Sequence, residues 1–163
     1  MQFFEGLDKA MENYSKAGGF LTAKAEGEVN TMTVSWGMTG WLWNKPVFMA
    51  FVRPQRYTRK LLDKADSFTV SIPFEGALAE ELKICGTKSG ADIDKSLVVS
   101  FVPARAVSSP VVGGCQAYYE CRLIYADEIK GPALPEEIKQ RNYADSDYHL
   151  IYVGEIAECY KKE

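Results

Sequence analysis

Four basic side chains gather between Arg53 and Lys60, directly after an apolar run at residues 47–52. Thr58 precedes a helix-like run and is expected to be its N-cap. A helix start offers free backbone N–H groups and the positive end of the helix dipole, and flanking arginines add charge-assisted donors. The segment therefore predicts an anion site, and a phosphate fits it. A basic, solvated first turn is the alternative and the commoner origin of such a cluster.

A second chemically suggestive pattern lies between Thr31 and Trp36, where hydroxyl and apolar side chains alternate. This two-residue period is typical of a half-buried strand. The core-facing side chains would be Met32, Val34 and Trp36. The exposed row of hydroxyls would be Thr31, Thr33 and Ser35. At a strand rise of about 3.3 Å this row spans roughly 13 Å, so we predict a platform for a flat polycyclic ring.

Three weaker candidates each leave two interpretations open. The loop at residues 86–95 carries polar and basic side chains, which either contact a ligand or are simply solvated. Residues 37–45 are expected to form a loop, in which Trp41 and Trp43 either stack on a planar ligand or cap one end of the fold. His149 is the chain's one histidine. A lone histidine is more often structural than catalytic, but its near-neutral pKa keeps an acid/base role open.

The elements that must position these residues are mostly strands. Alternating or apolar runs predict strands at 20–25, 31–36, 47–52, 67–72, 97–102, 115–125 and 148–160. Helical patterns occur at 4–14, 58–65, 77–85 and 134–142, with Gly86 expected as a C-terminal cap. About six or seven strands with short peripheral helices predict a mainly β fold, α+β at most, arranged as a barrel or sandwich.

Length and composition restrict the possible functions. We expect 163 residues to form a single domain over 1–163, and 47% hydrophobic residues indicate a globular chain. A net charge of −3 argues against general nucleic-acid binding. The N-terminus lacks a long apolar region, so we expect no membrane span and a cytoplasmic protein. Four scattered cysteines without a Cys-x-x-Cys pair predict reduced thiols and no metal site.

Three blocks carry a resemblance to a known family. The segments 30–37 (Asn-Thr-Met-Thr-Val-Ser-Trp-Gly), 53–58 (Arg-Pro-Gln-Arg-Tyr-Thr) and 85–95 (Cys-Gly-Thr-Lys-Ser-Gly-Ala-Asp-Ile-Asp-Lys) resemble the flavin reductase-like, FMN-binding split-barrel proteins. The likeness is strongest to the flavoredoxin-type branch. Order and spacing match over about residues 18–157. The resemblance implies a split β-barrel with bound FMN, and a homodimer with the flavin near the subunit interface.

The resemblance also implies which residues contact FMN. The ring would lie against residues 30–36, the phosphate at residues 53–58, and the loop around Lys95 would approach the flavin. The full implied set is Asn30, Thr31, Met32, Thr33, Ser35, Trp36, Arg53, Arg56, Tyr57, Thr58, Ser89, Gly90 and Lys95. A histidine often lies beside the flavin in this family, which makes His149 a candidate catalytic residue.

Three functions follow from this reading. The first is an NAD(P)H-dependent flavin reductase that passes electrons through FMN to an acceptor. The second is a flavoredoxin-like FMN electron carrier, supplied by a redox protein and without its own dehydrogenase activity. The third is a ligand-binding barrel without redox work. The blocks contain no separate nicotinamide motif, so they favour enzymatic activity only weakly and leave the donor and acceptor open.

Overall fold

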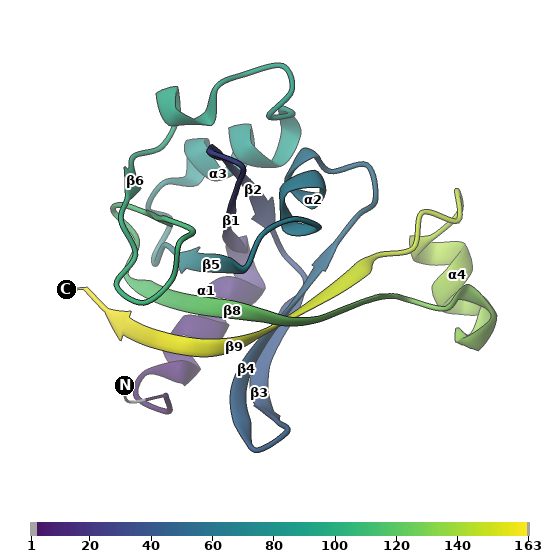
Figure 1. Cartoon of the computed structure of the whole chain (residues 1–163). Helices are drawn as coiled ribbons and strands as arrows, with labels where there is room; N and C mark the ends of the chain where they lie inside the picture. The colour runs from purple at the N-terminus through teal and green to yellow at the C-terminus, as the bar shows by residue number, and fades with distance from the viewer. Residues whose placement is uncertain (1–2, 163) are drawn as a thin grey trace.

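The computed structural model describes residues 3–162 and is organised around one antiparallel sheet (Figure 1). Its strand order is β2-β1-β5-β8-β9-β4-β3, and β6 and β7 form a separate two-stranded sheet. The sheet strands are β1 (Gly19–Ala25), β2 (Glu28–Val34), β3 (Gly37–Leu42), β4 (Lys45–Val52), β5 (Ser67–Ile72), β8 (Ala117–Glu128) and β9 (Leu150–Lys161). The mainly β, split-barrel fold predicted from the sequence is confirmed, with antiparallel pairing throughout.

Short helices surround the sheet. They are α1 (Leu7–Ala17), α2 (Tyr57–Leu62), α3 (Ala79–Thr87) and α4 (Glu136–Asn142), with two 3-10 turns, η1 (Lys95–Leu97) and η2 (Gly131–Ala133). The small pair consists of β6 (Phe101–Val102) and β7 (Val111–Val112). Figure 1 shows α4 at the far end of the long β8–β9 ribbon, away from α3 and α2.

The core explains why the strands form where they do. Strand β5 is buried at all of its positions, as expected for a strand with neighbours on both sides. One apolar cluster includes Leu21, Phe48 and Phe68, and a second, under α3, includes Phe20 and Cys85. Each fully buried Phe or Leu contributes about 2 kcal/mol. These two clusters fix β1 and α3 against each other, and β2 follows as the outer neighbour of β1.

Strand β2 forms one edge of the sheet, and the chain leaves it at Ser35 and Trp36 to begin β3 at the other edge. The two ends of the sheet approach each other there, because the Phe51 N–H donates to the Trp36 carbonyl at 3.1 Å. Since an edge strand pairs on one side, half of its backbone N–H and C=O groups are available to other partners. This open edge of β2 is where the candidate site lies.

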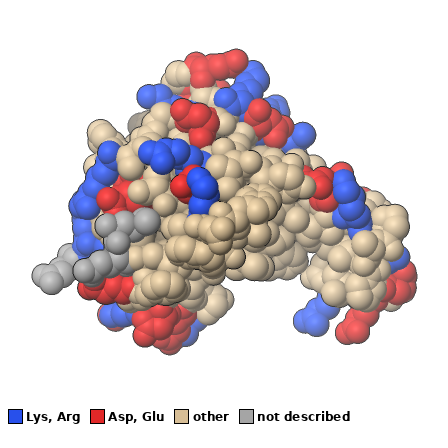
Figure 2. Space-filling model, turned by 60° about the horizontal axis from the view of Figure 1, so that its bottom comes forward, with Lys and Arg blue, Asp and Glu red and all other residues tan. Residues whose placement is uncertain are grey.

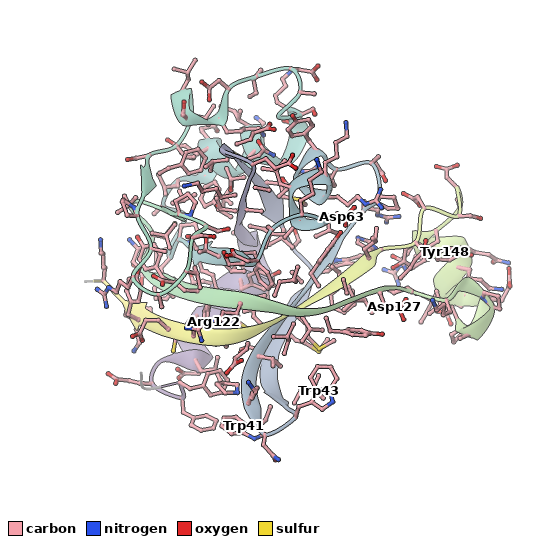
Figure 3. The ribbon with its side chains drawn as sticks, in the orientation of Figure 1. Trp41, Trp43, Asp63, Arg122, Asp127 and Tyr148 are labelled. Carbon is pink, nitrogen blue, oxygen red and sulfur yellow. The ribbon has the colours of Figure 1, made fainter. Side chains whose placement is uncertain are left out.

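The region expected to be a loop at residues 37–45 is instead a hairpin arm. Strand β3 pairs with β4 from Gly37 to Leu42, and Trp43 and Asn44 form the turn with φ values of 51° and 58°. The loop prediction was wrong because glycines and tryptophans hid a strand that depends on pairing with β4. Trp41 and Trp43 lie toward the tip of this hairpin (Figure 3), with exposed fractions of 60% and 57%.

Other boundaries also differ from the sequence prediction. Helix α2 begins at Tyr57 with Arg56 at the N-cap, so Thr58 lies inside the helix and does not cap it. Helix α3 runs through Gly86 and ends at Thr87, with Lys88 as its C-cap, so Gly86 does not cap it. The predicted strand at 97–102 is reduced to Phe101–Val102, and Leu97 is 86% exposed. Helix α1 begins at Leu7, three residues later than its apolar pattern.

Two further findings concern the whole described chain. The four cysteines are free, and three of them are buried, as expected for reduced thiols that pack as small apolar groups. Within residues 3–162, no helix is both long enough and apolar enough to cross a membrane.

Candidate functional site

Two adjoining cavities lie along the open edge of β2. The first, called here the α3 cavity, has a volume of about 180 Å³ and lies between β2, the start of α2 and the end of α3. The second, the His149 cavity, has a volume of about 230 Å³. Met32 and Arg56 line both, so the two cavities adjoin at these side chains.

The structure brings all of the predicted site residues to these cavities. Those in the α3 cavity are Asn30, Thr31, Met32, Arg56, Tyr57, Thr58, Ser89, Gly90 and Lys95. Those in the His149 cavity are Met32, Thr33, Ser35, Trp36, Arg53, Arg56 and His149. Residues from three separate blocks of sequence therefore meet in one cleft.

The α3 cavity contains two cations held by the carboxyl end of α3. The Arg56 guanidinium donates to the Gly86 carbonyl at 2.7 Å and to the Cys85 carbonyl at 3.0 Å. The Lys95 ammonium, in a residue only 3% exposed, donates to the Lys88 carbonyl at 2.6 Å and the Cys85 carbonyl at 3.3 Å. Cationic side chains are favoured at this end of a helix.

Neither cation has a carboxylate partner within residues 3–162. Burial lowers the pKa of Arg56 and of Lys95, and the Arg56 charge lowers the pKa of Lys95 further. Buried charges are normally paired, because an unpaired one loses its hydration without compensation. The α3 cavity therefore has an excess of positive charge and is suited to an anion.

Gly90 allows a close approach between the loop after α3 and strand β2. A Cβ at Gly90 would collide with the Asn30 amide and lie 2.8 Å from the Tyr57 ring. The Asn30 amide in turn donates to the Thr58 hydroxyl at 2.8 Å, in a buried contact that joins β2 to α2. The glycine thus lets three segments close around one small space.

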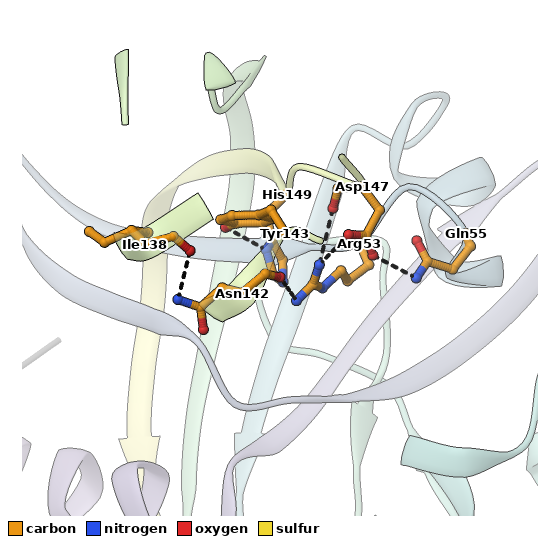
Figure 4. Close-up of polar contacts among 7 residues, drawn as sticks. All are labelled: Arg53, Gln55, Ile138, Asn142, Tyr143, Asp147 and His149. Atoms are coloured by element: carbon orange, nitrogen blue, oxygen red, sulfur yellow. Dashed lines mark hydrogen bonds and ion pairs between the residues drawn. The ribbon is translucent and has the colours of Figure 1, made fainter. Parts of the chain in front are cut away.

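Arg53 differs from its predicted place beside Arg56 in a phosphate site. It lines the His149 cavity and not the α3 cavity. Its guanidinium donates to Asp147 Oδ1 at 2.7 Å and to the Asn142 carbonyl at 2.8 Å, and Gln55 also donates to Asp147 (Figure 4). The charge of Arg53 is therefore compensated, and its contacts hold the segment after α4 against the barrel.

His149 is buried beside Arg53. It is 6% exposed, its Nδ1 is hydrogen-bonded to the Tyr143 hydroxyl at 2.9 Å, and its ring centroid is 4.7 Å from that of Trp36. Burial, and then the Arg53 charge, lower the pKa of His149 to about 4. The imidazole is neutral at pH 7, so this geometry fits packing and hydrogen bonding better than proton exchange near neutrality.

The predicted row of exposed hydroxyls on residues 31–35 is wrong for two of its three members. The Thr31 hydroxyl is fully buried, where it accepts from Thr22 at 2.9 Å and donates to the Leu21 carbonyl at 3.2 Å. Thr33 donates to the Leu82 carbonyl of α3. Ser35 is exposed. The expected inward packing of Trp36 is also wrong, because 45% of it is exposed beyond the end of β2.

Sequence reasoning missed several residues that line the cavities. Gln55, Cys85 and Thr87 line the α3 cavity, and Phe51 lines the His149 cavity. Gln55, Cys85 and Thr87 lie inside the blocks that carry the family resemblance, so their position in those blocks was an available signal. Phe51 lies within a run of apolar residues, and nothing in the sequence distinguished it from core.

The chain is similar in sequence to one protein family and in fold to several solved structures. The flavin reductase like domain matches residues 11–163. An FMN-binding protein from Thermus thermophilus is 23% identical, with a TM-score of 0.69, over 88% of this chain and 68% of that one. Flavoredoxin from Methanosarcina acetivorans is 24% identical, with a TM-score of 0.69, over 89% and 68%.

An NADH:FAD oxidoreductase from Streptomyces globisporus is 18% identical, with a TM-score of 0.68, over 88% of this chain and 73% of that one. At these identities the structural likenesses establish the shared fold. The match to the family model covers nearly the whole chain and includes all three blocks around the two cavities. The chain belongs to the flavin reductase like domain family.

Proposed function

We propose that this chain, as one domain over residues 1–163, binds FMN and acts as an NAD(P)H-dependent flavin reductase. The observation that carries the proposal is a pair of cations, buried Lys95 and half-buried Arg56, neither of which has a carboxylate partner among the described residues. A phosphate monoester supplies the negative charge that this pair lacks. Since the chain belongs to a flavin-binding family, the phosphate of FMN is the natural candidate.

The residues of the α3 cavity fit a single phosphate group. Arg56 and Lys95 compensate its charge, while Ser89 and Gly90 bring a hydroxyl and a backbone N–H to the same cavity. Thr58 and Tyr57 come from the first turn of α2. In this proposal Arg53 belongs to the ring side, because Asp147 already neutralises it.

The His149 cavity is suited to the isoalloxazine ring. Met32, Trp36 and Phe51 provide apolar surface that excludes water, and the open edge of β2 offers backbone hydrogen-bonding groups. Neutral His149 and the paired Arg53 line the same cavity and position Trp36. FMN, when bound, supplies the hydride and electron transfer chemistry, and the protein orients it and tunes its potential.

The electron donor and the assembly state are part of the same proposal. The Streptomyces relative, an NADH:FAD oxidoreductase, supports a nicotinamide donor, and the acceptor is unassigned. Exposed Trp43 and Tyr125, whose ring centroids are 6.1 Å apart, form an apolar surface on the β3–β4 hairpin and β8, which supports a homodimer. Four free cysteines support a reducing, cytoplasmic setting.

A fluorescence titration of the purified protein with FMN tests the cofactor assignment. We expect saturable quenching at one FMN per chain, with riboflavin binding at least tenfold more weakly because it lacks the phosphate. As a control for nonspecific charge effects, Lys83→Ala removes an exposed lysine of α3 that lines neither cavity, and it should leave the affinities for FMN and riboflavin unchanged. Equal affinities for FMN and riboflavin would contradict the phosphate site, and no flavin binding would favour the non-redox barrel.

Stopped-flow absorbance with NADH and NADPH tests the activity. Rapid oxidation of either nucleotide by the FMN-loaded protein is the expected result. An FMN-loaded protein that oxidises neither nucleotide, yet accepts electrons from a reduced redox protein, would identify an electron carrier and overturn the reductase assignment.

A further inference from the structure

The α4 lobe, defined here as residues 130–148, contacts the His149 side chain through one aromatic residue. No residue of α4 itself is buried, but Tyr143, which directly follows the helix, is 5% exposed. Its hydroxyl is hydrogen-bonded to Nδ1 of His149 at 2.9 Å (Figure 4). Figure 2 shows the lobe at the right, projecting from the main body. Tyr143 therefore carries a polar contact from this projection to the wall of the His149 cavity.

The direction of this hydrogen bond decides which ring nitrogen of His149 holds the proton, because a neutral imidazole has one N–H and one bare nitrogen. If Nδ1–H donated, the Tyr143 proton would need another acceptor. The structure gives that hydroxyl no second hydrogen-bond partner within residues 3–162, and an unpaired buried donor is costly. Burial raises the pKa of Tyr143, so the hydroxyl keeps its proton. The hydroxyl therefore donates to Nδ1, and the proton of His149 is on Nε2.

Packing holds the imidazole in this orientation and without charge. The ring centroid of Trp36 is 4.7 Å from that of His149. The Arg53 guanidinium carbon lies 5.0 Å from the centroid of Tyr143 and 5.9 Å from that of Trp36. Burial and the Arg53 charge lower the pKa of His149, with Asp147 opposing them. The ring beside Trp36 is thus a neutral imidazole in a fixed position.

The second ring nitrogen, Nε2, is available to a ligand. The structure gives it no hydrogen-bond partner within residues 3–162. It is nevertheless not one of the polar atoms that are completely enclosed without a partner. Since His149 is 6% exposed and lines the His149 cavity, Nε2 keeps contact with that cavity. A buried donor without a partner costs free energy, and an acceptor on a ligand restores it.

From these observations we propose that Tyr143 is a positioning residue, which holds His149 as its Nε2–H tautomer. The imidazole then presents an uncharged hydrogen-bond donor to the His149 cavity. Such a donor selects a flat ring with a carbonyl oxygen or imine nitrogen on its rim, whereas an imidazolium would select a negative charge. The pyrimidine edge of the isoalloxazine ring carries acceptors of this kind. The choice of ligand rests on the proposed flavin function, but the tautomer does not.

Long-range proton–nitrogen NMR of the FMN-free, ¹⁵N-labelled full chain reads the tautomer directly. His149 is the chain's one histidine, so its ring signals are identified without further assignment. At pH 7 we expect the proton on Nε2 and a bare Nδ1. A proton on Nδ1 in the unmodified chain overturns the proposal.

The variant Tyr143→Phe tests the positioning role in the same experiment. Both ring-nitrogen signals should move toward the average of the two tautomers, because Nδ1 loses its donor. The matched control is Tyr148→Phe, which removes a hydroxyl from the ring whose centroid is 5.0 Å from that of Tyr143, and it should leave the signals unchanged. Identical signals in Tyr143→Phe and the unmodified chain would overturn the role of Tyr143.

Flavin titrations of two His149 variants test the donor. Gln carries its amide nitrogen about as far from the backbone as Nε2, whereas Asn carries it about as far as Nδ1. His149→Asn should weaken FMN and riboflavin equally, by about fivefold, because one uncharged hydrogen bond to the ring is lost. His149→Gln should recover most of this affinity. Equal losses in the two variants, or no loss in either, would overturn donation from Nε2.

The outcomes separate this inference from the flavin assignment. An Nε2–H imidazole in a chain that binds neither FMN nor riboflavin would confirm the tautomer and overturn the flavin assignment. FMN binding by a chain with the proton on Nδ1 would overturn the role of Tyr143 alone. Saturation with FMN should shift the Nε2 signal and keep the tautomer, and an unchanged Nε2 signal would overturn donation to the flavin ring.

Discussion

Arg53 and Arg56 are three residues apart, and both line the cleft along β2, yet their guanidinium groups have different partners. Arg53 forms an ion pair with Asp147, whereas Arg56, among the residues that the structure describes, donates only to the carbonyls of Cys85 and Gly86. One arginine is neutralised within the chain, and the other is oriented but not neutralised. A basic cluster therefore cannot be read as one anion site, because the partner of each cation decides its role.

The two cavities differ in the same way. The α3 cavity keeps an excess of positive charge on Arg56 and Lys95, while the His149 cavity combines a compensated arginine with neutral His149 and Trp36. The first suits a charged group and the second suits a flat ring. The predictions below test this division, beginning with the largest expected effect.

Replacing Arg56 by Ala should have the largest effect, because it removes a cation from the α3 cavity. We expect FMN to bind 10- to 100-fold more weakly, about 1.5–3 kcal/mol, because a charge-assisted contact with phosphate is lost. Riboflavin affinity should change less than threefold. Parallel titrations of the variant with FMN and with riboflavin check this. Arg53→Ala is the comparison variant, and any loss of affinity in it should be similar for the two flavins. A loss shared equally by both flavins in Arg56→Ala would contradict the assignment.

The free energy of unfolding should depend on pH because His149 is buried in its neutral form. The pKa of His149 falls from 6.5 to about 4 on folding, so the unfolded chain binds more protons between these values. The stabilisation is fully present above pH 6.5 and is lost as the pH falls toward 4, by about 2–3 kcal/mol in all. Urea unfolding at pH 7, 5.5 and 4.5 measures it. His149→Asn should flatten this part of the profile, and an unchanged profile would exclude His149 as its source.

Gly90→Ala should weaken FMN binding by about tenfold, near 1.4 kcal/mol. The added methyl group collides with Asn30 and the Tyr57 ring, so the loop after α3 must withdraw from the α3 cavity. The matched control is Gly40→Ala, since a Cβ at Gly40 meets nothing within 4 Å. Flavin titration and thermal melting of both variants check this. Full affinity in Gly90→Ala would show that the close approach is not needed.

The Arg53–Asp147 pair should give the smallest effect. Both side chains are about one quarter exposed, so solvent screens the interaction. A double-mutant cycle with Arg53→Ala and Asp147→Ala should give a coupling energy of about 0.5–1 kcal/mol in unfolding free energy. A coupling near zero would mean that the carbonyl of Asn142, and not Asp147, holds Arg53 in place.

The sequence predicts the sheet well where side chains alone decide the structure. Residues 47–52 form a strand because their apolar content matches burial between neighbours, and residues 67–72 show the polar/apolar alternation of a strand. The hairpin arm at 37–42 could not be read in this way, since Gly37 and Gly40 carry no strand signal and the pairing with β4 is a tertiary effect. Strand 97–102 failed for the opposite reason, because apolar Leu97 is exposed on a 3-10 turn.

The site shows the same limit. Residue types and family blocks placed the predicted residues in one cleft, but they did not reveal which polar groups the fold itself uses. The hydroxyl of Thr31 donates to the Leu21 carbonyl on the paired strand β1, and that of Thr33 donates to the Leu82 carbonyl of α3, 49 positions later in the chain. The Arg53 guanidinium likewise donates to the carboxylate of Asp147, 94 positions later in the chain. Such partners depend on three-dimensional proximity, so a local pattern cannot disclose them.

The carbonyls at the end of α3 have a consequence for the kinetics of ligand exchange. Cys85, Gly86 and Lys88 hold Arg56 and Lys95 in place through hydrogen bonds that belong to the folded chain. The cations are thus ordered before an anion arrives, and association need not include the entropic cost of fixing two long side chains. A preorganised receptor of this kind favours fast entry of the ligand, so differences in affinity among variants should appear mainly in the dissociation rate.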